Sequence, residues 1–125
     1  MTPNRPREGA GFFIVSPTLD RVLVLEAGEY LDVPKGPRER NETPLQAALR
    51  EIWNRSGIKL TEGDMLTQDH YRVGNVTMFL AMSGKKPANS RGRNEAMYVP
   101  WRTLEENCEE FLIPAVEWAK EKSYG

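Results

Sequence analysis

Glu51, Asn54 and Arg55 are three side chains of this protein that could act together on a phosphate or a metal ion. Residues three and four apart share one face of a helix, so these side chains should project together. The Glu51 carboxylate is a hard oxygen ligand for magnesium or manganese, and Asn54 could add a neutral amide oxygen. Arg55 carries five donors and no acceptor, so it repels a divalent cation and can grip phosphate oxygens.

A longer pattern surrounds these residues. In register over the window 36–58 are Gly36, Glu42, Arg50, Glu51, Ile52, Gly57 and Ile58. This pattern resembles the Nudix box, G-x5-E-x7-R-E-U-x-E-E-x-G-U, where U is aliphatic. Two positions depart from it, because Asn54 and Arg55 stand where the family has a pair of glutamates. The box is therefore similar to that of the Nudix hydrolase superfamily, but degenerate.

The resemblance implies a chemistry and a set of roles. Nudix hydrolases split a nucleoside diphosphate linked to another group, with magnesium or manganese held by carboxylates on this helix face. By resemblance Gly36 and Glu51 belong to the metal site, Arg50 orients Glu51 or the loop before the helix, and Glu42 supports that loop. Glu51 and Arg50 are thus the expected catalytic residues. Since one carboxylate of three remains on the face, we expect much weaker metal binding than in the family.

Arg55 has two interpretations, which the sequence leaves open. Its guanidinium could stand in place of the metal and hold a diphosphate directly. Alternatively, Arg55 forms a salt bridge with Glu51 or Glu42 and leaves the site inert. Lys35, which precedes Gly36, could reach a substrate phosphate or simply be solvated.

Further candidates lie outside the box. The segment Asn94-Glu95-Ala96-Met97-Tyr98-Val99-Pro100 resembles the family's additional acid followed by an aromatic-Val-Pro turn, which makes Glu95 a candidate metal ligand or base. Arg91 and Arg93 could clamp the distal end of an anionic ligand, or belong to a solvated loop.

The segment before the box also resembles one branch of the family. Tyr30-Leu31-Asp32-Val33-Pro34-Lys35-Gly36 is similar, with one extra residue, to the aromatic-x-x-Pro-Lys-Gly of diadenosine polyphosphate hydrolases, diphosphoinositol phosphate hydrolases and decapping enzymes. A capped RNA 5′ end is thus one possible partner, beside a small nucleotide or diphosphate compound.

Composition narrows the class of protein. The 125 residues suit a single domain spanning 1–125, and 17 basic against 18 acidic residues give no global field that attracts nucleic acid or membranes. The single cysteine, Cys108, excludes an internal disulfide and is expected to pack near a helix. There is no apolar run of the roughly 20 residues that a membrane span needs, nor a signal sequence, so we expect a soluble cytoplasmic protein.

Periodicity predicts alternating strands and helices. Strands are expected at 11–15 and 21–25, as a hairpin, and at 30–33, 67–72, 76–82 and 97–99, with a closing helix at 113–122. The box helix should be capped by Thr43, start at Pro44 and end at Gly57, with Gln46 completing a capping box. Expected on its sheet-facing side are Leu45, Ala48, Leu49 and Ile52. This order is similar to the Nudix α/β/α sandwich, a mixed sheet between helices.

The remaining aromatic residues predict packing rather than chemistry. His70 lies in a predicted strand beside Tyr71, and a lone histidine is more often structural than catalytic. Trp53, Trp101 and Trp118 are expected to be core or packing residues.

Three functions remain open. The first is a Nudix-fold protein that binds a nucleoside diphosphate-containing ligand with weak or no hydrolysis. The second is an active pyrophosphohydrolase of nucleoside polyphosphates or capped RNA ends, which would need magnesium or manganese as its cofactor. The third is a non-catalytic protein-interaction domain, with a blocked cleft and an exposed apolar patch.

Overall fold

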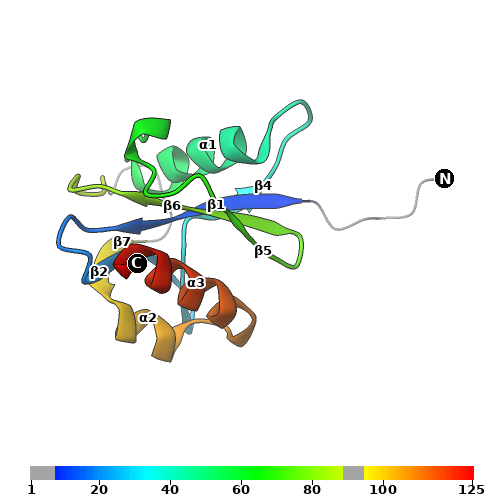
Figure 1. Ribbon diagram of the computed structural model, residues 1–125. Coiled ribbons are helices and arrows are strands. Elements are labelled where there is room, and N and C mark those ends of the chain that lie inside the picture. Colours follow the sequence, from blue (N-terminus) through cyan, green and yellow to red (C-terminus); the bar gives the residue numbers. More distant parts are fainter. Residues whose placement is uncertain (1–7, 89–94) are drawn as a thin grey trace.

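The computed structural model describes residues 8–88 and 95–125, which form a sheet with helices on both faces (Figure 1). The strands are β1 (Gly9–Val15), β2 (Arg21–Ala27), β3 (Tyr30–Asp32), β4 (Lys35–Pro37), β5 (Tyr71–Val73), β6 (Val76–Met82) and β7 (Ala96–Pro100). The helices are α1 (Pro44–Ser56), α2 (Trp101–Asn107) and α3 (Ile113–Tyr124), with 3-10 turns at Glu62–Asp64 and Glu110–Leu112.

The sheet is mixed. Its order is β3-β2-β1-β6-β5, with β4 paired to β1 and β7 paired to β2. β1 and β6 run parallel along their whole length, and the other pairs are antiparallel. One edge of β1 is paired with β6. The other edge is shared by two strands: β4 pairs with its first residues, Gly9–Gly11, and β2 pairs with it at Val15. The predicted α/β class, with a mixed sheet between helices, is confirmed.

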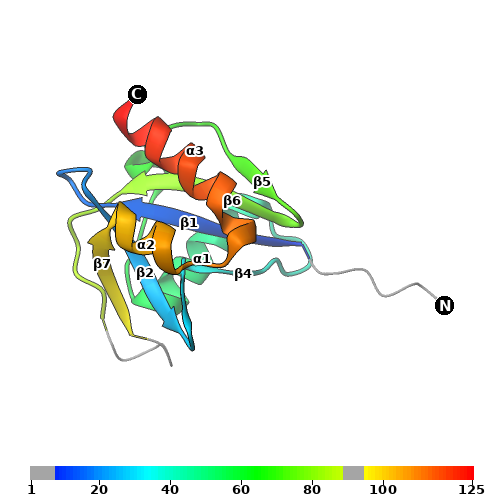
Figure 2. The same ribbon diagram turned by 90° about the horizontal axis from the view of Figure 1, so that it is seen from below.

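Two hydrophobic cores lie on opposite faces of the sheet because successive strand residues point to opposite sides. Phe13 of β1 is fully buried in the core beneath α2 and α3, whereas the neighbouring Phe12 is buried in the core beneath α1. Figure 2 shows α2 and α3 lying across the sheet on the face away from α1. Packing on both faces therefore holds β1 in place, and β1 in turn positions β4, which pairs with it.

Helix α1 begins and ends as its local signals predict. The Thr43 side chain accepts a hydrogen bond from the Gln46 backbone N–H, and the Gln46 side chain accepts one from the Thr43 backbone. Pro44 occupies the first turn, and Gly57 ends the helix in the left-handed conformation at φ 73°. Ala48 and Ile52 are buried as expected, with Ala47 beside them, and Leu45 and Leu49 are partly buried against the same core.

Several expectations need correction. The strand predicted at 67–72 is formed at Tyr71–Val73, because the Thr67 hydroxyl accepts a hydrogen bond from the Asp69 backbone N–H in an irregular turn. His70 therefore precedes the strand, and its ring lies 6.0 Å from that of Phe79 between centroids. Neither β4 nor α2 was predicted. Both are short elements that owe their place to partners far away in the chain.

The tryptophans and the cysteine fall into two groups. Trp101 is buried, and its indole N–H donates to the Leu19 carbonyl, while Trp118 packs partly buried against the same core. Trp53 is 39% exposed on α1, so it is not a core residue. Cys108 follows α2 and packs against the core, and burial raises the pKa of its thiol.

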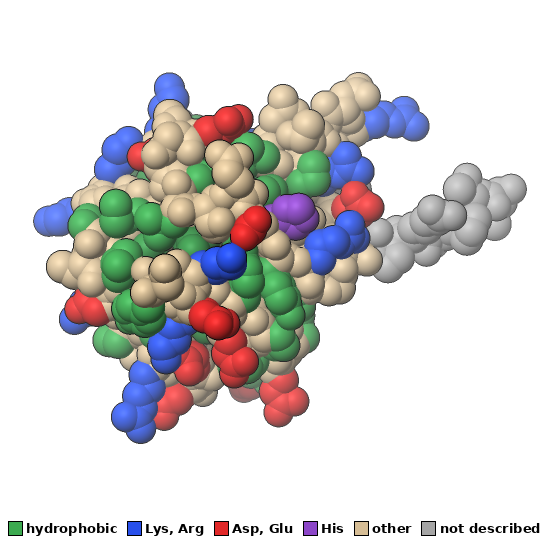
Figure 3. All heavy atoms as spheres, in the orientation of Figure 1, with side chains coloured by type: hydrophobic (Ala, Val, Ile, Leu, Met, Phe, Trp, Pro, Cys, Tyr) green, Lys and Arg blue, Asp and Glu red, His purple; other side chains and the backbone are tan. Residues whose placement is uncertain are grey.

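The surface agrees with the near-neutral charge. Charged side chains of both signs are interspersed on the face shown in Figure 3. Within residues 8–88 and 95–125, no helix is both long enough and apolar enough to span a bilayer.

Candidate functional site

Glu51 lies at the centre of the candidate site, on the face of α1 that contacts β4. Its side chain is 7% exposed, and each of its oxygens accepts a hydrogen bond from an arginine. Arg50 Nη1 lies 2.9 Å from Oε1, and Arg55 Nε lies 3.2 Å from Oε2. The carboxylate sits directly against Gly36, where an added Cβ would overlap it. The box glycine is thus required by the position of the box glutamate.

Arg50 joins this carboxylate to the loop before the helix. Its Nε and Nη2 donate to the two oxygens of Glu42 at 2.8 and 2.9 Å, and Nη2 also donates to the Pro37 carbonyl at 2.9 Å. Glu42 in turn accepts from the Glu39 backbone N–H at 2.8 Å. The hydrogen bonds from Arg50, followed by that from Glu39, lower the pKa of Glu42 to about 2. Hydrogen bonds to Glu42, and after it to Glu51, raise the pKa of Arg50 above its ordinary value.

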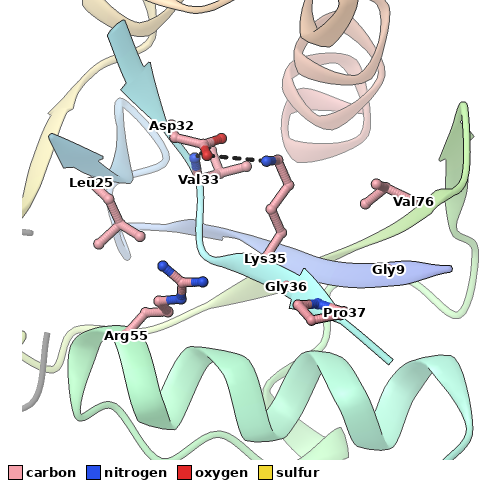
Figure 4. A pocket seen from close by; sticks show the side chains of 9 residues that line it. All are labelled: Gly9, Leu25, Asp32, Val33, Lys35, Gly36, Pro37, Arg55 and Val76. Carbon is pink, nitrogen blue, oxygen red and sulfur yellow. Dashed lines mark hydrogen bonds and ion pairs between the residues drawn. The ribbon is translucent and has the colours of Figure 1, made fainter. Parts of the chain in front are cut away.

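Arg55 contacts Glu51 and also lines a pocket of about 360 Å³. Its side chain is 43% exposed, and its salt bridge is with Glu51 rather than with Glu42. In Figure 4 the guanidinium points from α1 toward the space beside Leu25 and Val33. The pocket is lined by Gly9, Leu25, Asp32, Val33, Lys35, Gly36, Pro37, Arg55 and Val76.

Lys35 reaches the same pocket from the other side of β4. Since neighbouring strand residues point to opposite faces and Gly36 faces Glu51, Lys35 points away from α1. Its ammonium donates to Asp32 at 3.0 Å and lies 6.0 Å from the centre of the Phe111 ring. Sequence reasoning missed Asp32, because a spacing of three residues indicates such a pair on a helix, whereas Asp32 ends β3 and Lys35 begins β4.

The other candidates do not join this cluster. Asn54 is exposed on α1, and Glu95 is exposed just before β7, where its carbonyl accepts from the Glu26 backbone N–H. Arg91 and Arg93 lie outside the described residues.

The residues of the site do not fit a divalent cation. Across residues 8–88 and 95–125 there is no group of three or more histidine, cysteine, aspartate or glutamate side chains that could hold a metal. The oxygens of Glu51, the one box carboxylate on this face, already face two guanidinium groups. Magnesium prefers several hard oxygen ligands, which this arrangement does not supply.

A mixed sheet between helices, with an arginine-held glutamate under a glycine, defines the class: the chain has the fold of the Nudix hydrolases. It is similar to MutT, from work on Aliivibrio salmonicida and Vibrio cholerae, with a TM-score of 0.72 at 18% identity over 91% of this chain and 95% of that one. It is also similar to a C. elegans Ap4A hydrolase, with a TM-score of 0.71 at 16% identity over 89% and 94% of the two chains.

A third similar structure is the Nudix hydrolase RenU of M. smegmatis, with a TM-score of 0.68 at 16% identity over 94% of this chain and 86% of that one. No protein-family model matches the chain, and none of the curated proteins does. At this level of identity the solved structures establish the fold, and the function has to be argued from the site.

Proposed function

We propose that the protein binds a nucleoside diphosphate-containing ligand in the pocket beside Arg55 and hydrolyses it weakly or not at all. One observation carries this proposal: Arg55, on the helix face where the family has carboxylates, lines an open pocket while only its Nε is paired with Glu51. Compared with the family pattern, an amide and a guanidinium stand where two carboxylates are expected, and the pocket next to Arg55 is open.

Arg55 has the donors that such a ligand needs. Its Nε donates a hydrogen bond to Glu51, while the terminal amino groups of the guanidinium extend toward the pocket (Figure 4). A guanidinium can bind two phosphate oxygens at once. The pocket, at about 360 Å³, lies near the lower end of the roughly 300 to 1,000 Å³ typical of small-molecule sites. Lys35 would approach from the opposite side of β4, and Arg91 and Arg93 remain candidates for the distal end of the ligand.

Weak hydrolysis follows from the same residues. Family hydrolysis depends on metal ions that neutralise the diphosphate and activate water. Arg55 could neutralise a phosphate, but a guanidinium cannot hold a water by its oxygen as a metal ion does. Arg50 and Glu51 would therefore support binding and the shape of the loop more than turnover.

Calorimetric titration of the native protein with a panel of nucleoside diphosphate compounds, beside a phosphate-release assay, tests the proposal. We expect saturable binding and phosphate release far below ordinary enzyme rates. Metal-dependent turnover at ordinary rates would overturn it and make Glu51 and Glu95 the next residues to replace.

A second candidate is an active, metal-dependent pyrophosphohydrolase of nucleoside polyphosphates or capped RNA ends. The arrangement of Gly36, Glu42, Arg50 and Glu51 favours it, because an inert scaffold has no evident need for so closely bonded a frame. It would require magnesium or manganese held by Glu51, Glu95 and further acids.

The double variant Asn54→Glu, Arg55→Glu separates the two candidates. Magnesium-dependent hydrolysis that appears in the variant but not in the native chain would mean that the pocket is intact and the metal site alone was lost. The matched control is Arg102→Glu with Asn107→Glu, which makes the same charge change on exposed positions of α2. If the control gains the same activity, the effect is one of net charge.

A protein-interaction domain has the least support, because it predicts a blocked cleft and the pocket beside Arg55 is open. Lack of binding and of turnover in both assays would direct the search to protein partners. We retain a single domain spanning 1–125 and a cytoplasmic location as parts of the proposal.

A further inference from the structure

We propose that this pocket selects the metal-free form of its diphosphate ligand, so that magnesium weakens binding instead of assisting it. The inference rests on the proposed function and adds to it the charge state of the ligand. It follows from how the charged groups around Glu51 are oriented.

Arg55 lines the pocket, whereas the two box carboxylates, Glu51 and Glu42, do not. The Glu51 side chain is 7% exposed and that of Glu42 is 18% exposed, whereas Arg55 is 43% exposed. Asp32 also lines the pocket, but it is paired with Lys35 at 3.0 Å. A ligand in the pocket therefore meets the Arg55 guanidinium and the paired charges of Lys35 and Asp32, whereas Glu51 and Glu42 do not line the pocket.

A magnesium complex of a diphosphate suits this surface poorly. The metal covers phosphate oxygens that Arg55 would otherwise bind, and it lowers the negative charge that attracts the guanidinium. The bound metal also needs oxygen ligands from the protein or water. Its nearest box carboxylate, Glu51, is already contacted by Arg50 and Arg55, and the described residues contain no acidic cluster that could replace it.

The free diphosphate has no such difficulty. It presents bare phosphate oxygens to the terminal amino groups of Arg55, which can form two parallel hydrogen bonds. Nucleotides and inorganic pyrophosphate share this chemistry, so the test must include both.

The test is calorimetric titration of the full chain with ADP, and separately with inorganic pyrophosphate, first in EDTA and then at rising magnesium. By mass action we expect the apparent Kd to rise about tenfold when roughly nine tenths of the ligand is complexed with magnesium. Arg55→Gln should weaken binding in EDTA by about tenfold or more, as the loss of a charged hydrogen-bond partner predicts. Arg55→Lys keeps the charge, so magnesium should still weaken binding to it.

Arg102→Gln is the matched control. This arginine is 86% exposed on α2 and pairs with Glu106, so its replacement should leave both the affinity and the magnesium effect unchanged. Asn54→Glu with Arg55→Glu should reverse the magnesium effect, because that variant restores carboxylates to the helix face.

The outcomes separate the inference from the proposed function. Binding that is strengthened by magnesium, or unaffected by it, overturns the inference and leaves the proposed function standing. Pyrophosphate binding weakened by magnesium, with no binding of any nucleotide, supports the inference and overturns the nucleoside part of the proposed function. The absence of binding by either ligand in EDTA and in magnesium overturns both.

Discussion

At Gly36 there is room for a hydrogen atom and nothing larger, because the Glu51 carboxylate lies against the backbone there. We predict that Gly36→Ala lowers the free energy of unfolding by about 1 to 3 kcal/mol, as overpacking of a closed site does. Urea denaturation measures this loss. Gly63→Ala is the control, since an added Cβ there has its nearest neighbour at 3.5 Å. A Gly36 variant as stable as the Gly63 variant would mean that β4 moves away from α1 at little cost.

Glu42 makes the stability of the loop depend on pH. Its pKa falls from 4.5 to about 2 on folding, chiefly through the hydrogen bonds from Arg50. A carboxyl group with a lowered folded pKa contributes stability above its unfolded pKa and loses that contribution as the pH falls toward the folded pKa. We predict that Glu42→Gln is less stable than the native chain at neutral pH and that the gap closes between about pH 4.5 and about pH 2. Chemical denaturation across that range tests this, and a gap independent of pH would contradict it.

Some residues of the site could be predicted from the sequence. Glu51, Arg50, Glu42 and Gly36 were identified by the spacing of the box, and the structure brings them into contact. Of the two partners considered for Arg55, the structure selects Glu51, since Arg50 already occupies Glu42. That choice depends on side-chain packing between the helix and the loop, which spacing alone does not determine.

At the scale of the elements, α1 depends on the reciprocal hydrogen bonds at its first turn. We predict that Thr43→Ala lowers the free energy of unfolding by about 1 kcal/mol, the usual cost of a lost N-cap. Thermal or urea denaturation measures this. Gln46→Glu is a matched comparison, because it keeps an acceptor for the Thr43 backbone N–H and adds an acid at a helix start, so it should not destabilise. Equal losses in both variants would argue against the cap as the cause.

Local signals explain which elements could be predicted. The limits of α1 follow from residues within its own ends, Thr43 and Gly57, so the sequence of that segment suffices. β4 has three residues, and it is a strand because Gly9–Gly11 of β1 pair with it from far away in the chain. α2 likewise packs against β2, β3 and β7, while its own seven residues carry little helical pattern. Short elements that form because of distant partners therefore cannot be predicted from their own residues.

For the whole molecule, the two cores should unfold together. Phe12 and Phe13 are neighbours in β1 and are fully buried on opposite faces. We predict that Phe12→Ala and Phe13→Ala each lower the free energy of unfolding by about 3 to 5 kcal/mol. Circular dichroism and tryptophan fluorescence should follow one transition in each variant. Two separate transitions in either variant would show that one helix layer can melt while the other persists.

The parallel pairing of β1 with β6 has a consequence for how the chain reaches this structure. β1 begins at Gly9 and β6 at Val76, so each pair of neighbours in the middle of the sheet is separated by more than half of the chain. Closing so long a loop carries a large entropic cost before any contact compensates it, which slows folding. During synthesis β1 has to wait for β6 to leave the ribosome. Until then, the apolar residues of β1 lack their central partner and depend on the β2 hairpin and α1 for cover.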